Sequence, residues 1–526
     1  MYDLIIKNGL IADGTGQPAY YGDIAIEKNK IACVCKDGHI DAPAVKTIDA
    51  EGMIVCPGFI DGHSHSDMGN FTYPINKLSQ GITTEVVGNC GFSDYPFTAG
   101  GREAVHTVLS SFIDPPYRDE DCERDFVRFI SEKKEDGIMF NFASLVGFGI
   151  LRAEVMGLAE RPATEEEISK MCSILDQELQ KGALGLSVGL IYLPQLFAST
   201  EELERLAAVV KKHDKILTAH VRGEGNTLLD AVDEIISVCE KSGCRLVISH
   251  LKAIGQANWG SLHLVLEKIE NARKRGADIM ADCYYYKCSA TSVLSILPPW
   301  AISGSAEGVR QILKDPQKKG QIREYLLPGG ESTASELLQS IYIYNLKGAY
   351  KEYDGMILQD IAKAMGKDLP DTVFALIEKE DSILVLGDTQ SEEDYKDCVV
   401  KDYVMTGSDA NPHGPADKDF CNPRDYGAFP HFFNKYVRQE KLLSMEEAIH
   451  KMTGLTAACY RLKDRGLIRE GYFADITIID KDDFREGNSD ANPAVLACGV
   501  PYVIINGHIQ VENGTHHQLP VGEVLV

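Results

Sequence analysis

Two histidines separated by one residue are the first feature of this sequence that could do chemistry. His63 and His65 lie in the stretch Asp61-Gly62-His63-Ser64-His65. In an extended segment, side chains two positions apart point the same way, so both imidazoles can reach one ion. Imidazole nitrogen suits Zn²⁺ and other borderline-soft ions. The pair therefore predicts a metal site whose remaining ligands come from elsewhere in the chain.

Four further side chains are candidates for those ligands. Cys90, His220, His250 and Asp409 each follow a short apolar run, and Cys90 lies in the glycine-rich stretch 88–91. Glycine neighbours let the backbone curve around a functional atom. A single histidine or cysteine in such a place is more commonly a structural residue. Six candidates at the ends of similar runs favour a shared metal centre instead.

Eight apolar, β-rich runs would position these candidates, at residues 59–61, 84–87, 141–145, 185–188, 216–219, 246–249, 279–281 and 403–405. Helical patterns at 165–181, 201–213, 228–241 and 262–275 lie between many of them. This alternation predicts an α/β fold, a (β/α)8 TIM barrel. Barrel enzymes build their active sites at the carboxyl ends of the strands, which is where the candidates lie.

Both ends of the chain read as short strands with turn signals at Asn8-Gly9, Asp13-Gly14 and Asn506-Gly507. We expect residues 1–56 and 462–526 to pair in one small β-sandwich domain. The catalytic barrel is then predicted at 57–286 and 401–461. The gap between the seventh and eighth runs is too long for one helix, so 287–400 is predicted to be an inserted lid subdomain that includes the helix before the eighth strand.

Composition excludes several classes of protein. The 526 residues include 53 basic and 78 acidic ones, a net charge of −25, which opposes binding to nucleic acid or to an anionic membrane. Fourteen cysteines are too sparse for a disulfide scaffold, so reduced thiols in the cytoplasm are expected. The first residues do not read as a signal peptide, and no run of about 18 apolar residues predicts a membrane span.

The motifs resemble those of the amidohydrolase superfamily and, within it, the N-acyl-D-amino-acid deacylases (D-aminoacylases). The stretches that carry the resemblance lie at 57–65, 81–84, 88–91, 182–187, 249–252, 407–409, 464–466 and 471–475. Most binuclear amidohydrolases bridge their metals with a carboxylated lysine or a glutamate. D-aminoacylases instead place a cysteine after the second strand, and Cys90 matches it.

The resemblance implies a zinc enzyme. It assigns Cys90, His220 and His250 to a tight Zn²⁺ site, and it leaves open a second, weaker site formed by His63, His65 and Asp409.

The same resemblance implies that Lys252, Arg424, Tyr192 and Tyr284 hold the substrate carboxylate. Tyr285 and Tyr286 compete with Tyr284 for that role, and surface salt bridges are the structural alternative for the two cations.

The predicted reaction is hydrolysis of the amide bond of a small N-acyl-D-amino acid, which releases a carboxylate such as acetate and a free D-amino acid. Zinc lowers the pKa of bound water towards about 7, and Asp409 acts as general base and then general acid. Neutral, apolar D-amino acids are the expected substrates.

The alternatives are a cyclic-amide hydrolase such as a hydantoinase or dihydroorotase, or a non-catalytic scaffold that has kept the barrel. The sequence makes no prediction of the oligomeric state.

Two positions depart from the family pattern. Phe148 stands where the family often has a histidine, and Asn422 replaces the histidine of a His-Pro-Arg stretch. We expect both near the substrate rim, where they would alter substrate choice rather than metal binding.

Overall fold

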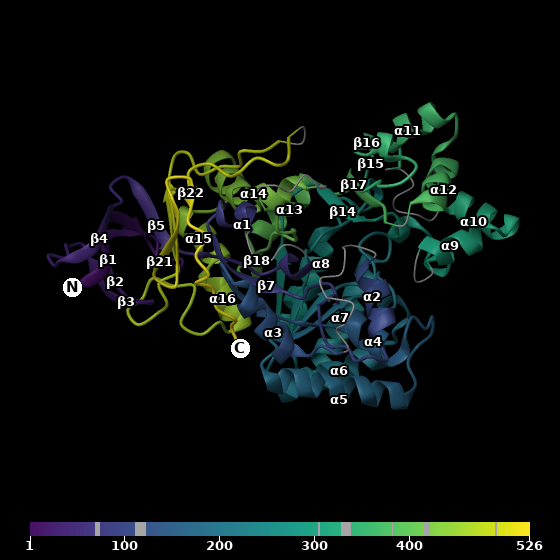
Figure 1. The fold of residues 1–526 in the computed structure, drawn as a ribbon, viewed down its shortest axis with the longest axis horizontal. Helices are drawn as coiled ribbons and strands as arrows, with labels where there is room; N and C mark the ends of the chain where they lie inside the picture. The colour runs from purple at the N-terminus through teal and green to yellow at the C-terminus, as the bar shows by residue number, and fades with distance from the viewer. Residues whose placement is uncertain are drawn as a thin grey trace.

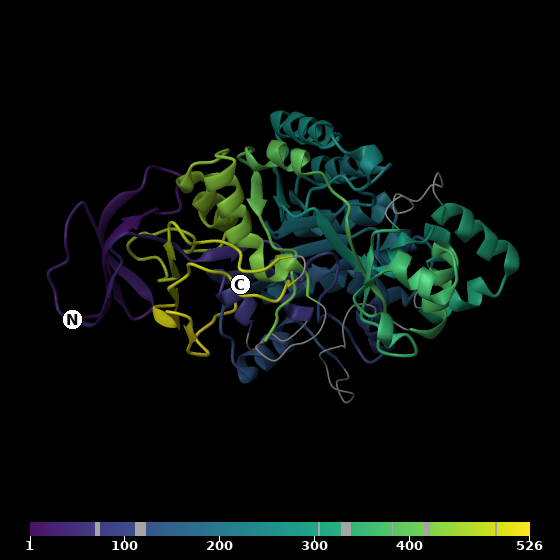
Figure 2. The ribbon, with the colours of Figure 1, turned by 90° about the horizontal axis from the view of Figure 1, so that it is seen from above.

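The computed structural model describes residues 1–68, 74–110, 123–302, 306–327, 338–380, 382–414, 421–489 and 492–526. Parallel strands and their helices occupy the middle of the molecule (Figure 1). Seen from above, the sheet that holds the N-terminus and the segment around residues 290–390 lie at opposite ends of the long axis (Figure 2).

All eight predicted runs form strands, and these pair in parallel within two sheets. The first sheet contains β6 (Phe59–Asp61), β7 (Ile82–Val87) and β8 (Asn141–Ser144). The second contains β9 (Val146–Gly147), β10 (Gly185–Gly189), β11 (Ile216–His220), β12 (Arg245–Ile248), β13 (Ile279–Cys283) and β18 (Val404–Thr406). The α/β fold is thus as predicted, but the strands are organised as two sheets rather than as one closed barrel sheet.

Backbone hydrogen bonds cross both gaps between the two sheets. The N–H of Leu184, just before β10, donates to the carbonyl of Ser144 in β8 over 2.8 Å. At the other gap, the N–H of Asp409 donates to the carbonyl of His63 over 2.8 Å, and that of His65 donates to Ala410 over 3.1 Å. The segments that follow β6 and β18 are therefore held side by side.

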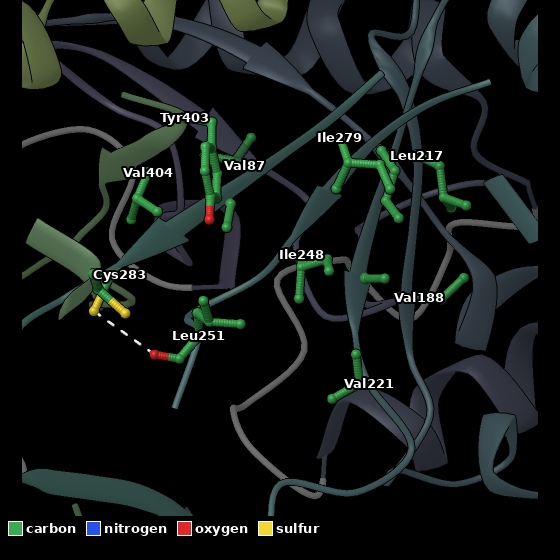
Figure 3. Packing of buried hydrophobic residues seen from close by; sticks show 14 of the residues in the cluster. Val87, Val188, Leu217, Val221, Ile248, Leu251, Ile279, Cys283, Tyr403 and Val404 are labelled. Carbon is green, nitrogen blue, oxygen red and sulfur yellow. Dashed lines mark hydrogen bonds between the residues drawn. The ribbon is translucent and has the colours of Figure 1, made fainter. Parts of the chain in front are cut away.

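Alternate residues of the strands face two different hydrophobic cores. Within β12, Val247 belongs to an inner cluster, while its neighbours Leu246 and Ile248 belong to the cluster that includes the surrounding helices. Figure 3 shows outer residues from β7, β10, β11, β12, β13 and β18. The inner cluster takes Ile60, Val86, Ala143, Leu184, Ile216, Val247, Met280 and Met405, one from each predicted strand or the position before it. This is the period of two that a strand buried on both faces requires.

The predicted helices form within about one residue of their expected ends, as α5 (Glu165–Lys181), α6 (Thr200–Lys212), α7 (Leu228–Ser242) and α8 (Leu262–Lys274). Two begin with capping boxes, Thr164 with Glu167 before α5 and Ser199 with Glu202 before α6. Such boxes satisfy two N–H groups at the start of a helix. The other helices of this part are α1 (Ile75–Leu78), α2 (Arg102–Ser110), α3 (Phe126–Asp136), α4 (Phe148–Met156), α13 (Glu392–Val399), α14 (Pro423–Phe433), α15 (Met445–Met452) and α16 (Gly454–Tyr460).

The two chain termini share one nine-stranded sheet. From the N-terminal part come β1 (Tyr2–Ile11), β2 (Tyr20–Glu27), β3 (Lys30–Lys36), β4 (Ala44–Asp49) and β5 (Met53–Pro57); from the C-terminal part come β19 (Ile476–Asp480), β20 (Tyr502–Ile505), β21 (His508–Glu512) and β22 (Thr515–His516). Antiparallel pairing of β5 with β19 joins the two parts. The expected pairing of the termini is present, but the strands are arranged as one sheet, and the predicted β-sandwich is not confirmed.

One turn prediction in this sheet is wrong and another is confirmed. Asn8-Gly9 lies inside β1, where the register with β2 shifts between Ile6 and Gly9. Asn8 has φ of 61°, and its N–H donates to Asp23, so the pair forms a bulge instead of a hairpin turn. Asn506-Gly507, with both φ values positive, does form the hairpin turn between β20 and β21.

The long stretch between β13 and β18 builds a sheet and a core of its own. Its strands are β14 (Cys288–Ser292), β15 (Tyr342–Tyr344), β16 (Met356–Ile357) and β17 (Leu384–Asp388), and its helices are α9 (Ala306–Leu313), α10 (Pro316–Leu326), α11 (Leu358–Met365) and α12 (Leu369–Lys379). We call the segment from β14 to β17, residues 288–388, the insertion. Among the described residues, none of the helices has the length and apolar character needed to cross a bilayer.

Candidate active site

All six predicted metal ligands lie at the carboxyl ends of the parallel strands. His220 is the last residue of β11, and the other five follow their strands within four residues: His63 and His65 after β6, Cys90 after β7, His250 after β12, and Asp409 after β18. Neighbouring parallel strands end at the same edge, so side chains from distant parts of the chain meet there.

The first half of the donor set contains two histidines and a carboxylate. Nε2 of His65 lies 3.1 Å from Oδ1 of Asp409, and that oxygen lies 3.6 Å from Nε2 of His63. The three ligand atoms could therefore bind one ion.

The second half continues from the same histidine. Sγ of Cys90 lies 3.5 Å from Nε2 of His63 and 3.5 Å from Nε2 of His250. Nε2 of His250 lies 2.9 Å from Nδ1 of His220. The six donor atoms thus form one continuous line, which we call the donor line, with Cys90 in its middle.

The backbone is strained at three of these positions. Cys90, His250 and Asp409 have φ values of 54°, 36° and 49°, in the left-handed region that non-glycine residues seldom adopt. Such strain persists only where the surroundings impose it, and it concentrates at functional sites. The loops after three different strands are therefore shaped to aim these side chains at one place.

The donor set fits a zinc ion. Tetrahedral zinc with bonds of about 2.3 Å to sulfur and 2.0–2.1 Å to nitrogen places the two donor atoms about 3.6 Å apart, close to the separations around Cys90. Burial raises the pKa of the Cys90 thiol, but His63 and His250 outweigh burial and hold that pKa well below its usual value. The thiolate that results is the form that binds metal.

Asp282, which sequence reasoning missed, supports two of the histidines. One carboxylate oxygen lies 3.2 Å from Nδ1 of His63 and also accepts the backbone N–H of His250 over 2.7 Å. A carboxylate that fixes the second ring nitrogen of a metal-binding histidine orients the ring and strengthens the ligand. Its position at the end of the seventh strand was the signal that could have found it.

Glu224 is a second missed residue. Its Oε1 lies 3.4 Å from Nε2 of His220, 3.2 Å from Nδ1 of His250 and 2.5 Å from Nζ of Lys252. Burial raises the pKa of Glu224, but His220 and Lys252 hold it well below the usual value. The only sequence signal was its place four residues after His220, in the loop that follows β11.

The two predicted carboxylate-binding cations lie together beside the donor line. Nη2 of Arg424 lies 3.0 Å from Oδ2 of Asp409, and its Nε donates to the carbonyl of Asp409 over 2.7 Å. The Tyr284 ring lies 4.5 Å from the Arg424 guanidinium and 5.7 Å from Nζ of Lys252. Both cations are buried, which excludes surface salt bridges.

The four candidate tyrosines have different surroundings. Tyr284 lines the cavity described below, and its hydroxyl accepts a hydrogen bond from Gln390 over 2.6 Å. Tyr285 is buried against Phe432, and Tyr286 packs against His431.

Tyr192 lies on another side of the cavity, where its ring contacts those of Phe92 and His220, each with centroids 5.1 Å apart. Its role in holding a carboxylate stays a prediction.

Neither position that departs from the family pattern is among the described residues that line the cavity. Phe148 is fully buried at the start of α4. Asn422 caps α14, where its side chain accepts the N–H of Arg424. Neither side chain therefore lines the described cavity, although Asn422 caps the helix that carries Arg424, and an effect of either residue on substrate choice stays a prediction.

A cavity of about 420 Å³ opens over the donor line. Its lining includes His65, Cys90, His220, His250 and Asp409 together with residues of the insertion. Its volume is within the usual range for pockets that bind small molecules.

Comparison with known proteins agrees with this geometry. The sequence pattern that defines the amidohydrolase family matches residues 46–107 and 402–511 of this chain. N-acyl-D-glutamate deacylase from Alcaligenes xylosoxydans xylosoxydans is 30% identical over 510 residues, which cover 96% of this chain and 93% of that protein. D-aminoacylase from the same organism is 30% identical over 511 residues, 96% and 94% of the two chains. The chain belongs to the amidohydrolase family, in its D-aminoacylase branch.

Solved structures distinguish this branch from the cyclic-amide hydrolases. The N-acyl-D-glutamate deacylase of Bordetella bronchiseptica, solved with zinc and a phosphonate inhibitor, matches with a TM-score of 0.83 at 29% identity, over 100% of this chain and 99% of that one. An L-hydantoinase from Arthrobacter aurescens reaches 0.57 at 14% identity over 100% of both chains, which shows the shared fold alone. These comparisons confirm the predicted family and a metal-dependent hydrolase. They favour this prediction over a hydantoinase and over a non-catalytic scaffold.

Proposed function

We propose that this amidohydrolase cleaves the amide bond of N-acyl-D-amino acids and releases a carboxylate and a free D-amino acid. The observation that carries the proposal is the donor line with two buried cations, Lys252 and Arg424, directly beside it. Its deacylase relatives at 30% identity are named for this class of substrate.

Two adjacent sites can be drawn along the donor line. Cys90, His220 and His250 would hold the tight zinc ion, and His63, His65 and Asp409 a second, weaker one. Cys90 contacts His63 of one group and His250 of the other, so its thiolate would lie within reach of an ion at either site. When bound, zinc supplies a water of pKa about 7 and a Lewis acid for the scissile carbonyl.

Asp409 moves the proton. Burial alone would raise the pKa of this carboxyl group, but Arg424 and His65 hold it well below its usual value, so it is ionised at neutral pH. It accepts a proton from the attacking water as the new C–O bond forms. It then delivers that proton to the nitrogen as the C–N bond breaks.

Lys252, Arg424 and Tyr284 orient the substrate by its carboxylate. The planar guanidinium presents paired donors that match a carboxylate, and Lys252 adds a point charge. Holding the carboxylate at this place and the carbonyl at the donor line fixes two points of the molecule. With these two points fixed, the amino-acid side chain can occupy only one of the two remaining positions at the chiral carbon. The site would therefore select one enantiomer.

For the scaffold, we propose a closed (β/α)8 barrel over residues 57–286 and 401–461. The hydrogen bonds across both gaps between the parallel sheets support closure, as does the inner cluster to which every predicted strand contributes. Residues 287–400 would form the lid, and residues 1–56 and 462–526 the small β-domain.

A substrate screen tests the proposal. N-acetyl-D-methionine, N-acetyl-D-leucine and their L-enantiomers would be assayed with Zn²⁺ and after chelation. We expect zinc-dependent hydrolysis of the D-forms. Hydrolysis of hydantoin with no action on either N-acetyl series would contradict it.

A further inference from the structure

The cavity has two sides of different chemistry, and the strand order separates them. Lys252 and Tyr284 follow β12 and β13, and Arg424 lies at the start of α14, which follows β18; these three strands are neighbours at one end of their sheet. Phe92 and Leu196 come from the loops after β7 and β10. β10 lies near the other end of that sheet, and β7 lies in the other sheet. The donor line runs between the two sides.

The second side carries several apolar side chains, and we call the part of the cavity that they line the apolar chamber. Its lining residues are Phe92, Ile191, Leu196, Ile296, Ile302 and Ile341. The last three belong to the insertion, and Leu193 and Leu196 from the β10 loop pack against the insertion's core. Barrel loop and insertion therefore form one surface.

The cation on this side, Arg222, is already committed. Its Nε and Nη2 contact both carboxylate oxygens of Glu234 at 2.9 and 3.1 Å. Its Nη1 and Nη2 donate to the carbonyls of Leu196 and Ala198 over 2.9 and 3.0 Å. The guanidinium thus anchors the loop that carries Leu196. Because Arg222 is paired in this way, the chamber should favour a substrate with an apolar group at this place over one with an acidic group.

The amide geometry decides which part of the substrate faces the chamber. The carboxylate is attached on the nitrogen side of the amide, and the acyl substituent on the carbonyl side. With the carboxylate at Lys252 and Arg424 and the carbonyl at the donor line, the acyl substituent points away from the cations. We infer, on the basis of the proposed function, that the chamber binds a long apolar acyl chain, and that the enzyme prefers medium-chain fatty acyl D-amino acids to their acetyl forms.

Two substrate series on the zinc-loaded protein test the inference. The first keeps D-methionine and lengthens the acyl group from acetyl through butanoyl and octanoyl to dodecanoyl. The second keeps the acetyl group and enlarges the side chain from D-alanine through D-leucine to D-phenylalanine. We expect kcat/KM to rise about 100-fold from acetyl to octanoyl, because six further methylene groups leave water. The second series should vary by less than about 10-fold.

Variants at Leu196 test whether the apolar chamber causes the preference for long acyl chains. Leu196→Trp should lower the octanoyl-to-acetyl ratio of kcat/KM at least about 10-fold, because the indole fills the chamber. Leu196→Ala should move the preferred acyl chain to a greater length. The exposed Leu264 on α8 provides the control, and Leu264→Trp should leave both rates unchanged.

The outcomes separate this inference from the proposed function. Zinc-dependent hydrolysis of acetyl substrates with no gain from longer acyl chains would overturn the inference and leave the proposed function intact. A larger gain in the side-chain series would assign the chamber to the amino-acid side chain and also overturn it. No hydrolysis of either series would overturn the proposed function itself.

Discussion

The donor line and the apolar chamber share one cavity but are built in different ways. Every donor comes from the end of a parallel strand, and carboxylate oxygens of Asp282 and Glu224 contact ring nitrogens of three of the histidines. The apolar chamber combines side chains from the loops after β7 and β10 with side chains from the insertion. On the proposed function, the ends of the parallel strands would determine which bond is broken, and the insertion would influence which substrate is accepted.

The largest expected effect lies on the donor-line side. Asp409→Asn should lower kcat by about 10²–10⁴-fold, because the amide cannot accept the proton from water. Zinc content of the tight site should stay unchanged. Steady-state kinetics and elemental analysis measure both quantities, with the exposed Asp388→Asn as the matched control. Near-normal turnover in Asp409→Asn would remove this carboxylate from the mechanism.

The next prediction concerns the insertion. Ile343 in β15 is fully buried in the insertion's core. Ile343→Ala should lower the free energy of unfolding by about 2–5 kcal/mol through the cavity that it leaves. Denaturant titration measures the loss, and zinc content should be unaffected. If the variant folds but loses zinc, the donor line depends on the insertion and the two regions are not separable.

A pH effect tests the barrel side alone. Lys451 is buried and donates to the carbonyl of Val404 in β18, and burial lowers its pKa to about 8 from 10.5. The unfolded chain then binds more protons between pH 8 and 10.5, so the free energy of unfolding should rise over that window, by about 3 kcal/mol. Lys451→Met should remove this rise. An unchanged pH profile in that variant would assign the effect to other groups.

The smallest effect is expected from a residue behind the donors. Asp282→Asn should weaken zinc binding about 10–100-fold, because His63 loses a carboxylate that orients its ring. Competition with a chelator of known affinity measures the change, and the exposed Asp278→Asn is the control. Equal zinc affinities in the two variants would show that Asp282 does not support the site.

Many of the parallel strands and their helices could be predicted from the sequence because their signals are local. Capping pairs such as Thr164 with Glu167 mark where a helix begins, and apolar runs bounded by turn residues mark the strands. The convergence of the candidate donors could be predicted because His63, Cys90 and His250 each follow such a run.

What could not be predicted depends on contacts between distant segments. Glu224 and Asp282 gain their roles only when the strands meet, and a lone acidic residue carries no signal of that. Asn8-Gly9 has turn chemistry that a bulge uses equally well, so only the pairing of β1 with β2 decides between them. The apolar residues of the insertion, such as Ile296 and Ile341, have no motif that points to a cavity.

The central claim is that Cys90 is a ligand at the middle of the donor line, and zinc content tests it most directly. Elemental analysis of the purified protein would compare Cys90→Ala with Cys283→Ala, which removes another buried cysteine, at the end of β13. We predict that Cys90→Ala loses the tightly bound zinc and that Cys283→Ala keeps it. Full zinc content in a folded Cys90→Ala protein would contradict this account of the site.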